Sequence, residues 1–90
     1  MTSASELPEP ALLEVSSRDP AIPPRKLTGT ILIRLKKSLT VRTDQELAVS
    51  APVRVQSKDL LSLGEVLRCL PEPEARWTVE VLVQRSMLIV

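Results

Sequence analysis

The side chains that could do chemistry are few in this sequence of 90 residues. Cys69 is the only cysteine and there is no histidine, so no imidazole is available to activate a cysteine or serine nucleophile. Glu72 and Glu74 lie two residues apart in a proline-rich turn, which favours a solvated acidic loop over a catalytic carboxylate pair. Gly29 and Gly64 are the only glycines, so no glycine-rich loop can hold a phosphate. The sequence predicts a protein that is not an enzyme and has no metal site.

The densest positive stretch consists of Arg34, Lys36, Lys37 and Arg42. These residues can be the solvated face of a strand, or they can attract anionic lipid head groups or an acidic groove while the apolar side of the segment is buried. The chain has 12 basic and 11 acidic residues, for a net charge of +1. Because no aromatic residues are interleaved with the cations, nucleic acid is not expected as a partner.

The composition indicates a small core that needs reinforcement. A chain of this length buries only about 60–65% of its unfolded surface, and small domains are commonly reinforced by disulfides, metals or association. One cysteine cannot form an intramolecular disulfide, so self-association or an apolar ligand remains. Trp77 is the only aromatic residue, so Leu, Val and Ile must supply most of the buried surface, in an ordinary core or around an apolar cavity.

The first 26 residues are predicted to be a proline-rich arm. They hold five of the eight prolines, which remove backbone donors and favour extended conformations. We therefore expect residues 1–26 to be extended or disordered and to lie on a partner rather than in the core. The stretch MTSASELPEP lacks the basic and apolar regions of a secretory signal, and no apolar run reaches the roughly 20 residues that a membrane-spanning helix needs.

Residues 27–90 are predicted to form a single β-rich dimerisation domain. Apolar and polar residues alternate over 28–36, 39–43 and 52–56, and again from Trp77, where valines occupy every second position. The last residues, MLIV, are apolar on both faces of a strand. An uncovered strand edge of this kind invites pairing with another chain.

One segment favours a helix instead. This segment is 58–70, where leucines recur at the helical spacings of three and four. Gly64, in its middle, argues against a helix, because glycine costs about 1 kcal/mol relative to alanine there. The leucines are the stronger indication. They are Leu60, Leu63, Leu67 and Leu70. The stretch TGTILIRLKKSLTV (28–41) fits both the strand and the helix period. An α+β fold with a helix at 58–70 is therefore the alternative to a mostly β fold.

Three stretches, in this order, resemble one protein family. They are PALLEV with DPAI (10–15 and 19–22), ILIRLKKSLTV (31–41), and APVRVQSKDL with LPEP and VEVLV (51–60, 70–73 and 79–83). Together they are similar to the 9b-type accessory proteins of betacoronaviruses, which are encoded in an alternative reading frame inside the nucleocapsid gene. The resemblance covers most of the chain with gaps. It departs at Lys36-Lys37, where the family has a Gly-Ser pair, and at 60–70, where the family has strand and loop.

The resemblance implies a small, intertwined, β-sandwich-like homodimer with an apolar central tunnel for a lipid or other long-chain aliphatic molecule. It implies a viral accessory protein that antagonises host innate immune signalling through a mitochondrial outer-membrane import receptor. The implied locations are the host cytoplasm, the mitochondrial outer membrane, other intracellular membranes through peripheral association, and the virion. The alternative is a small cellular adaptor that completes its core by pairing strands with a protein partner.

Two sets of site residues are expected. The first set is expected to line the tunnel, because the period-two patterns place its residues on the apolar faces of their strands. These residues are Ile31, Ile33, Leu35, Val53, Val55, Val79 and Val81. By position, the resemblance implies that residues 32–49 can bind the receptor as a helix. That helix would carry the stripe Leu32, Leu35 and Leu39, and Ser38 stands where the family has a serine whose phosphorylation opposes binding.

Overall fold

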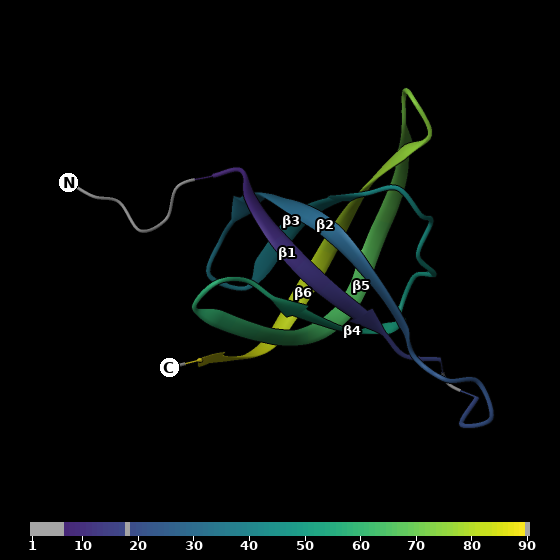
Figure 1. Cartoon of the computed structure of the whole chain (residues 1–90), viewed down its shortest axis with the longest axis horizontal. Helices are drawn as coiled ribbons and strands as arrows, with labels where there is room; N and C mark the ends of the chain where they lie inside the picture. The colour runs from purple at the N-terminus through teal and green to yellow at the C-terminus, as the bar shows by residue number, and fades with distance from the viewer. Residues whose placement is uncertain (1–6, 18, 90) are drawn as a thin grey trace.

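The protein is a closed barrel of six antiparallel strands (Figure 1). The computed structural model describes residues 7–17 and 19–89. The strands are β1 (Glu9–Val15), β2 (Arg25–Arg34), β3 (Ser38–Thr43), β4 (Pro52–Gln56), β5 (Leu60–Glu72) and β6 (Arg76–Leu88). Around the barrel they follow the order β1-β2-β3-β6-β5-β4. The predicted mostly β class is confirmed, and one chain closes the barrel by itself.

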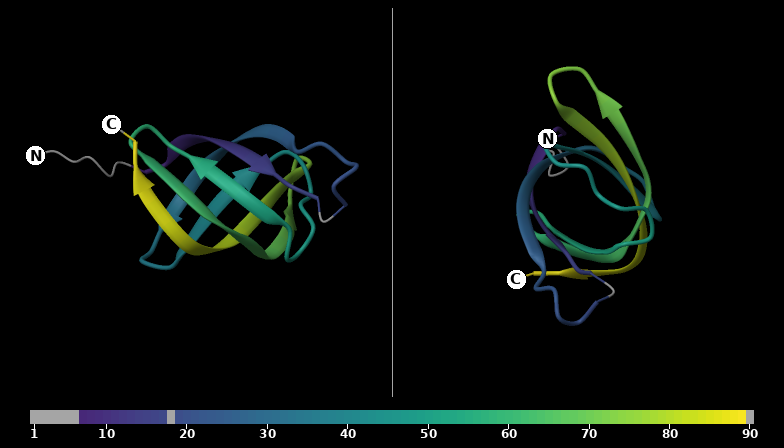
Figure 2. Two further views of the ribbon diagram at one scale, coloured as in Figure 1. Left: turned by 90° about the horizontal axis from the view of Figure 1, so that it is seen from below. Right: turned by 90° about the vertical axis from the view of Figure 1, so that its right-hand side faces the viewer.

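The barrel has two ends that carry different connections (Figure 2). We call one the β2–β3 end: there lie the turn between β2 and β3, the turn between β4 and β5, the start of β1 and the finish of β6. The opposite β1–β2 end carries the connections 16–24 and 44–51 and the projecting turn between β5 and β6. This division fixes which surface residues come together.

Aliphatic side chains fill the interior. Along β1, β3, β4 and β6 every second residue points inward, because successive side chains of a strand alternate between its two faces. The buried apolar residues form one cluster, made of Ala11, Leu13, Val15, Leu27, Ile31, Leu39, Val41, Leu47, Val53, Val55, Val66, Val79 and Val81. Each leucine, isoleucine or valine of the cluster contributes about 1.5–3 kcal/mol when fully buried. Cys69 and Trp77 pack partly buried against the cluster.

The predicted helix at 58–70 is wrong, because this segment is β5. It pairs with β4 on one side and with β6 on the other. The pairing with β6 shifts register twice: at Leu63/Gly64 the extra residue is Gln84 of β6, and at Val66/Arg68 it is Leu67 of β5. Only the second shift changes which face the following side chains of β5 occupy. Leu63 and Leu70 therefore lie on the same face of β5 although they are seven residues apart, and a strand with such a bulge can carry leucines at helical spacings.

The expected N-terminal arm supplies a strand of the barrel. Residues 9–15 form β1, which pairs with both β2 and β4 and buries Ala11, Leu13 and Val15 in the core. The prolines lie at its ends or in the following connection, where a missing backbone donor is tolerated. The expectation that this stretch stays out of the core is wrong for residues 9–15; for residues 1–6 and 18 it lies outside the described residues.

Candidate functional site

Five of the seven residues expected to line a tunnel face the inside of the barrel. They are 0–3% exposed and belong to the core cluster, and they are Ile31, Val53, Val55, Val79 and Val81. In the single chain these side chains pack against one another. Period-two alternation was sufficient to place them on the apolar side of their strands.

The other two expected tunnel residues, Ile33 and Leu35, point to the solvent. The pairing of β2 with β3 shifts between Ile31 and Ile33, so Leu32 is an extra residue in β2. A bulge of this kind reverses the faces that follow it. Ile33 is 49% exposed and Leu35 63% exposed, and strict alternation from Ile31 could not predict this.

The expected receptor stripe is divided between the inside and the outside of the barrel. Leu39 is 2% exposed and Leu35 is 63% exposed, while Leu32 and Ser38 are half-buried. Ser38 and Leu39 belong to β3, which pairs with β2 on one side and with β6 on the other. The stripe can form a helix only if β3 leaves the barrel.

Exposed apolar side chains gather at the β2–β3 end. Six of the eleven exposed large apolar residues in the described part of the chain lie there, just before β1, around the turn between β2 and β3, and at the end of β6. They are Leu7, Ile33, Leu35, Met87, Leu88 and Ile89, and Leu88 is the most exposed at 75%. We call these six residues the apolar end.

An unpaired strand edge lies beside the apolar end. The ladder of β3 with β6 reaches Leu82, and the Val83 amide then donates to the Lys37 carbonyl. Residues 84–88 of β6 pair with β5 but have no strand partner on their other edge among the described residues. The sequence predicted an open apolar strand here, and the barrel closes without covering it.

Cations surround the apolar end. Lys36, Lys37, Lys58 and Arg85 are exposed. Arg34 is already paired and cannot offer its charge to a partner in the way that these exposed cations can. Its guanidinium lies 3.0 Å from a carboxylate oxygen of Glu9 and 3.4 Å from the Ser57 hydroxyl. The basic cluster expected from the sequence is thus divided, and of its four members only Lys36 and Lys37 have no ion-pair partner among the described residues.

Arg42, the fourth member of that expected cluster, pairs with Glu72 at 3.2 Å. The hydrogen bond donated by the Thr78 hydroxyl is the main cause that lowers the pKa of Glu72. Burial opposes it as the next largest effect, and Arg42 and Arg76 lower the pKa further. Glu74 lies 3.7 Å from Arg76 instead. The two carboxylates therefore have separate structural partners, and Glu72 joins β3, β5 and β6.

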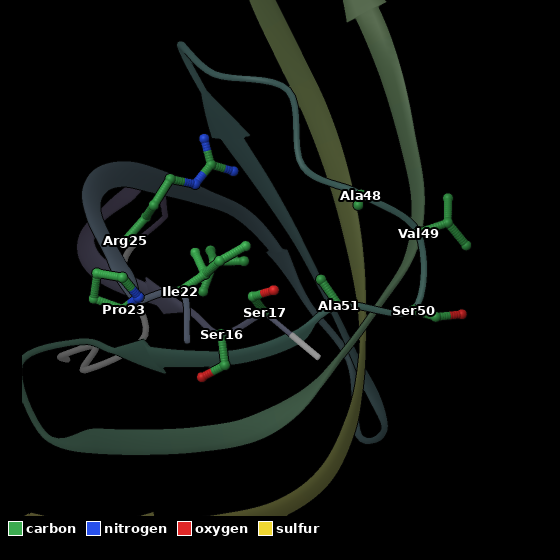
Figure 3. Close-up of a pocket in the computed structure, with 10 residues that line it drawn as sticks. Ser16, Ser17, Ile22, Pro23, Arg25, Ala48, Val49, Ser50 and Ala51 are labelled. Carbon is green, nitrogen blue, oxygen red and sulfur yellow. The ribbon is translucent and has the colours of Figure 1, made fainter. Parts of the chain in front are cut away.

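A hollow of about 520 Å³ lies at the β1–β2 end, between the connections 16–24 and 44–51 (Figure 3). Ile22, Pro23 and Val49 give it apolar walls. Arg25, at its border, donates to the Gln45 side chain at 3.1 Å and so joins the two connections. Mouths of barrels are common places for small ligands, and this hollow had no signal in the sequence because its walls come from separate loops.

Cys69 is half-buried, and its sulfur accepts a hydrogen bond from the Leu47 amide at 3.4 Å. This contact fixes the connection 44–51 against β5. Within residues 7–17 and 19–89, no three His, Cys, Asp or Glu side chains come together as ligands for a metal ion. In the same residues, no helix is long and apolar enough to cross a membrane.

The chain matches no protein-family model, no curated protein and no solved structure.

Proposed function

We propose that the protein is a non-enzymatic viral accessory protein that acts through apolar association: it pairs with a second copy and binds a lipid-like aliphatic molecule. The supporting observation is the apolar end with the unpaired edge of β6 beside it. An open edge presents backbone donors and acceptors that another strand can satisfy. Exposed leucine, isoleucine and methionine side chains each contribute about 1.5–3 kcal/mol when they become fully buried.

The proposed dimer consists of two barrels joined at this edge, since each copy already closes its own strands. The interior of each barrel is filled by its own side chains. The proposed aliphatic ligand therefore occupies the apolar surface between two β2–β3 ends, next to Ile33 and Leu35, rather than the space between Val55 and Val81.

The proposed effect on the host is antagonism of innate immune signalling through a mitochondrial outer-membrane import receptor. For the receptor to bind residues 32–49 as a helix, β3 must leave the barrel and expose Leu39. That opening breaks the ladders to β2 and β6. Phosphorylation of Ser38 would add about two negative charges to the segment and is proposed to oppose receptor binding.

The same open edge favours a second candidate, a small cellular adaptor whose β6 receives a strand from a different protein. In that case the chain alone is a monomer without a co-purified aliphatic molecule. The coding nucleotides also separate the two candidates, because an overlapping frame that reads as a nucleocapsid protein supports the viral one.

Native mass spectrometry and size exclusion with light scattering test the proposal directly. We expect a dimer that carries an aliphatic ligand. Leu88→Lys is expected to give a monomer, because it places a charge at the apolar end beside the open edge. Leu70→Lys is the matched control, since Leu70 is 51% exposed and pairs with Thr78 near the turn between β5 and β6, at the opposite end. A wild type that stays monomeric and ligand-free at high concentration contradicts the proposal.

Binding to the receptor is tested separately by a pull-down with Leu35→Asp and Ser38→Glu. Both variants are expected to weaken receptor binding, the first by removing an apolar anchor and the second by adding charge. Unchanged binding of both variants overturns the role of residues 32–49.

A further inference from the structure

The two ends of the barrel differ in charge. At the β2–β3 end, the exposed cations Lys36, Lys37, Lys58 and Arg85 face a single exposed carboxylate, Asp59, within residues 7–17 and 19–89. Glu9, the other carboxylate there, is neutralised by Arg34. At the opposite β1–β2 end, the exposed cations of the described residues, Arg25, Lys26 and Arg76, are nearly balanced by four exposed carboxylates. These carboxylates are Asp19, Asp44, Glu46 and Glu74.

The cations of the β2–β3 end stand among exposed aliphatic side chains. The turn between β2 and β3 presents Leu35, Lys36 and Lys37 in succession, with Ile33 just before it. On the other side of the same end, Lys58 is next to Asp59, whose carbonyl accepts the Ile89 amide at 2.9 Å. Lysine and arginine beside aliphatic residues fit the head-group region of an anionic bilayer, where the cations meet phosphates and the aliphatic groups reach the acyl chains.

We propose that the β2–β3 end docks on an anionic membrane surface, and that a docked chain is a monomer because the bilayer and a second copy need the same side chains. This inference rests on the proposed function, since it identifies a bilayer as a partner of the apolar end. The β1–β2 end, where the exposed charges of the described residues nearly balance, lacks this attraction to anionic lipid and therefore points away from it. The charge asymmetry thus sets the orientation of the barrel axis.

Added salt is expected to strengthen the dimer in solution and to weaken the docking of the monomer on the membrane. Two copies joined at their β2–β3 ends bring like charges together, so added salt screens a repulsion and tightens the dimer. Docking brings the same cations to anionic phosphates, so added salt screens an attraction and weakens binding. Screening of exposed charges is substantial at physiological ionic strength, where the Debye length is about 8 Å.

Vesicle co-sedimentation tests the docking. The full chain is mixed with vesicles of phosphatidylcholine alone or of phosphatidylcholine with phosphatidylserine. Binding is expected with the anionic vesicles and is expected to fall as salt is added. Lys36→Gln with Lys37→Gln is expected to weaken it about 30-fold, from about 1 kcal/mol for each cation at an anionic surface. The control Lys26→Gln with Arg76→Gln makes the same change of net charge at the other end and is expected to leave binding unchanged.

The contribution of the aliphatic side chains at the β2–β3 end is tested by a second variant with a matched control. Leu35→Ser is expected to weaken binding to the anionic vesicles about tenfold, since it removes an aliphatic side chain that would enter the bilayer. Leu70→Ser, at an exposed position near the opposite end of the barrel, is expected to change binding little. Equal losses in the two variants, or in the two pairs of charge variants, overturn the assignment to this end.

Light scattering on the same samples separates this inference from the proposed function. A dimer in solution that binds neither kind of vesicle at low salt overturns the docking but supports the proposed dimer. In that case an acidic protein is the partner that the cations would bind. A chain that is monomeric at every salt concentration but binds anionic vesicles overturns the proposed dimer and supports the docking. Covalently cross-linked dimers that bind vesicles as well as the free chain does overturn the competition between them.

Discussion

Replacement of Gly64 by alanine tests the barrel most directly. The inward-facing Gly64 lies where β5 and β6 change register, and β6 backbone passes close to it. A Cβ at this position would lie 2.9 Å from the Leu82 carbonyl carbon, closer still to its oxygen, and 3.1 Å from the Val83 Cα. Contacts between carbon atoms are favourable at about 3.5–4.0 Å, so the two strands must separate.

The loss of stability in Gly64→Ala follows from this separation of β5 and β6. Overpacking of a core costs about 1–3 kcal/mol and sometimes more, and each weakened ladder hydrogen bond adds about 0.5–1.5 kcal/mol. We therefore expect Gly64→Ala to lower the free energy of unfolding by about 3–5 kcal/mol, out of the roughly 5–15 kcal/mol that a folded domain has in total. If 58–70 were a helix, Gly64→Ala would instead raise the free energy of unfolding, since alanine stabilises a helix by about 1 kcal/mol relative to glycine.

Urea unfolding measured by the fluorescence of Trp77, the only aromatic residue, reports this change. The matched control is Gly29→Ala, whose Cβ would meet the Arg42 carbonyl oxygen at 2.9 Å and side-chain atoms of Leu13 and Val41 at 3.0 Å. Because two of these three neighbours are side chains that can move, we expect a smaller loss of about 1–2 kcal/mol. An unfolding midpoint for Gly64→Ala that equals or exceeds that of Gly29→Ala refutes the strand packing described here.

Three further perturbations test the packing, an ion pair and a titration. Leu39→Ala is expected to destabilise the fold by about 2–5 kcal/mol and Leu35→Ala by less than about 0.5 kcal/mol, measured by urea unfolding. Arg34→Met is expected to cost about 1–2 kcal/mol, because it leaves a half-buried carboxylate without its cation. The low pKa of Glu72 stabilises the fold above the pKa of an unfolded glutamate, about 4.3, and this stabilisation is lost as the pH falls through the folded value. Thr78→Val removes part of it, so the stabilities of variant and wild type are expected to converge as the pH is lowered.

These three expectations have distinct contrary results. Similar losses for the two leucine variants would mean that they share one face after all. The pair of Arg54 with Glu14 is the control for Arg34, since Arg54 is 54% exposed and Arg54→Met is expected to cost less than about 1 kcal/mol. A stability difference between Thr78→Val and wild type that stays constant from neutral to acidic pH would exclude Glu72 as its origin.

Local alternation predicted most strands because it depends only on neighbouring residues. The runs at 39–43, 52–56 and 77–83 became β3, β4 and β6 with their apolar residues inward. The bulges of β2 and β5 could not be predicted in this way, since they arise from how two distant strands fit together. The bulge at Leu32 turned Ile33 outward, and the bulge at Leu67 placed Leu63 and Leu70 on the same face of β5, which a strict period of two does not predict.

The candidate site was predictable only in pieces. Leu35, Lys36 and Lys37 are adjacent in the sequence, and the apolar stretch 87–89 is equally evident. That these stretches meet at one end with Lys58 follows from the strand order, which alternation does not specify. The hollow beside Ile22 and Val49 depends on the same topology.

The pairing of β3 with β6 has a consequence for how the chain acquires its fold. Residues 38–43 find their second neighbour only in residues 77–82, so the barrel cannot close on the ribosome until β6 has emerged. Proteins dominated by such distant pairings have high contact order and fold slowly. Until then, the nascent β3 and β5 present unpaired edges, and during this interval the chain is most exposed to chaperones and to aggregation.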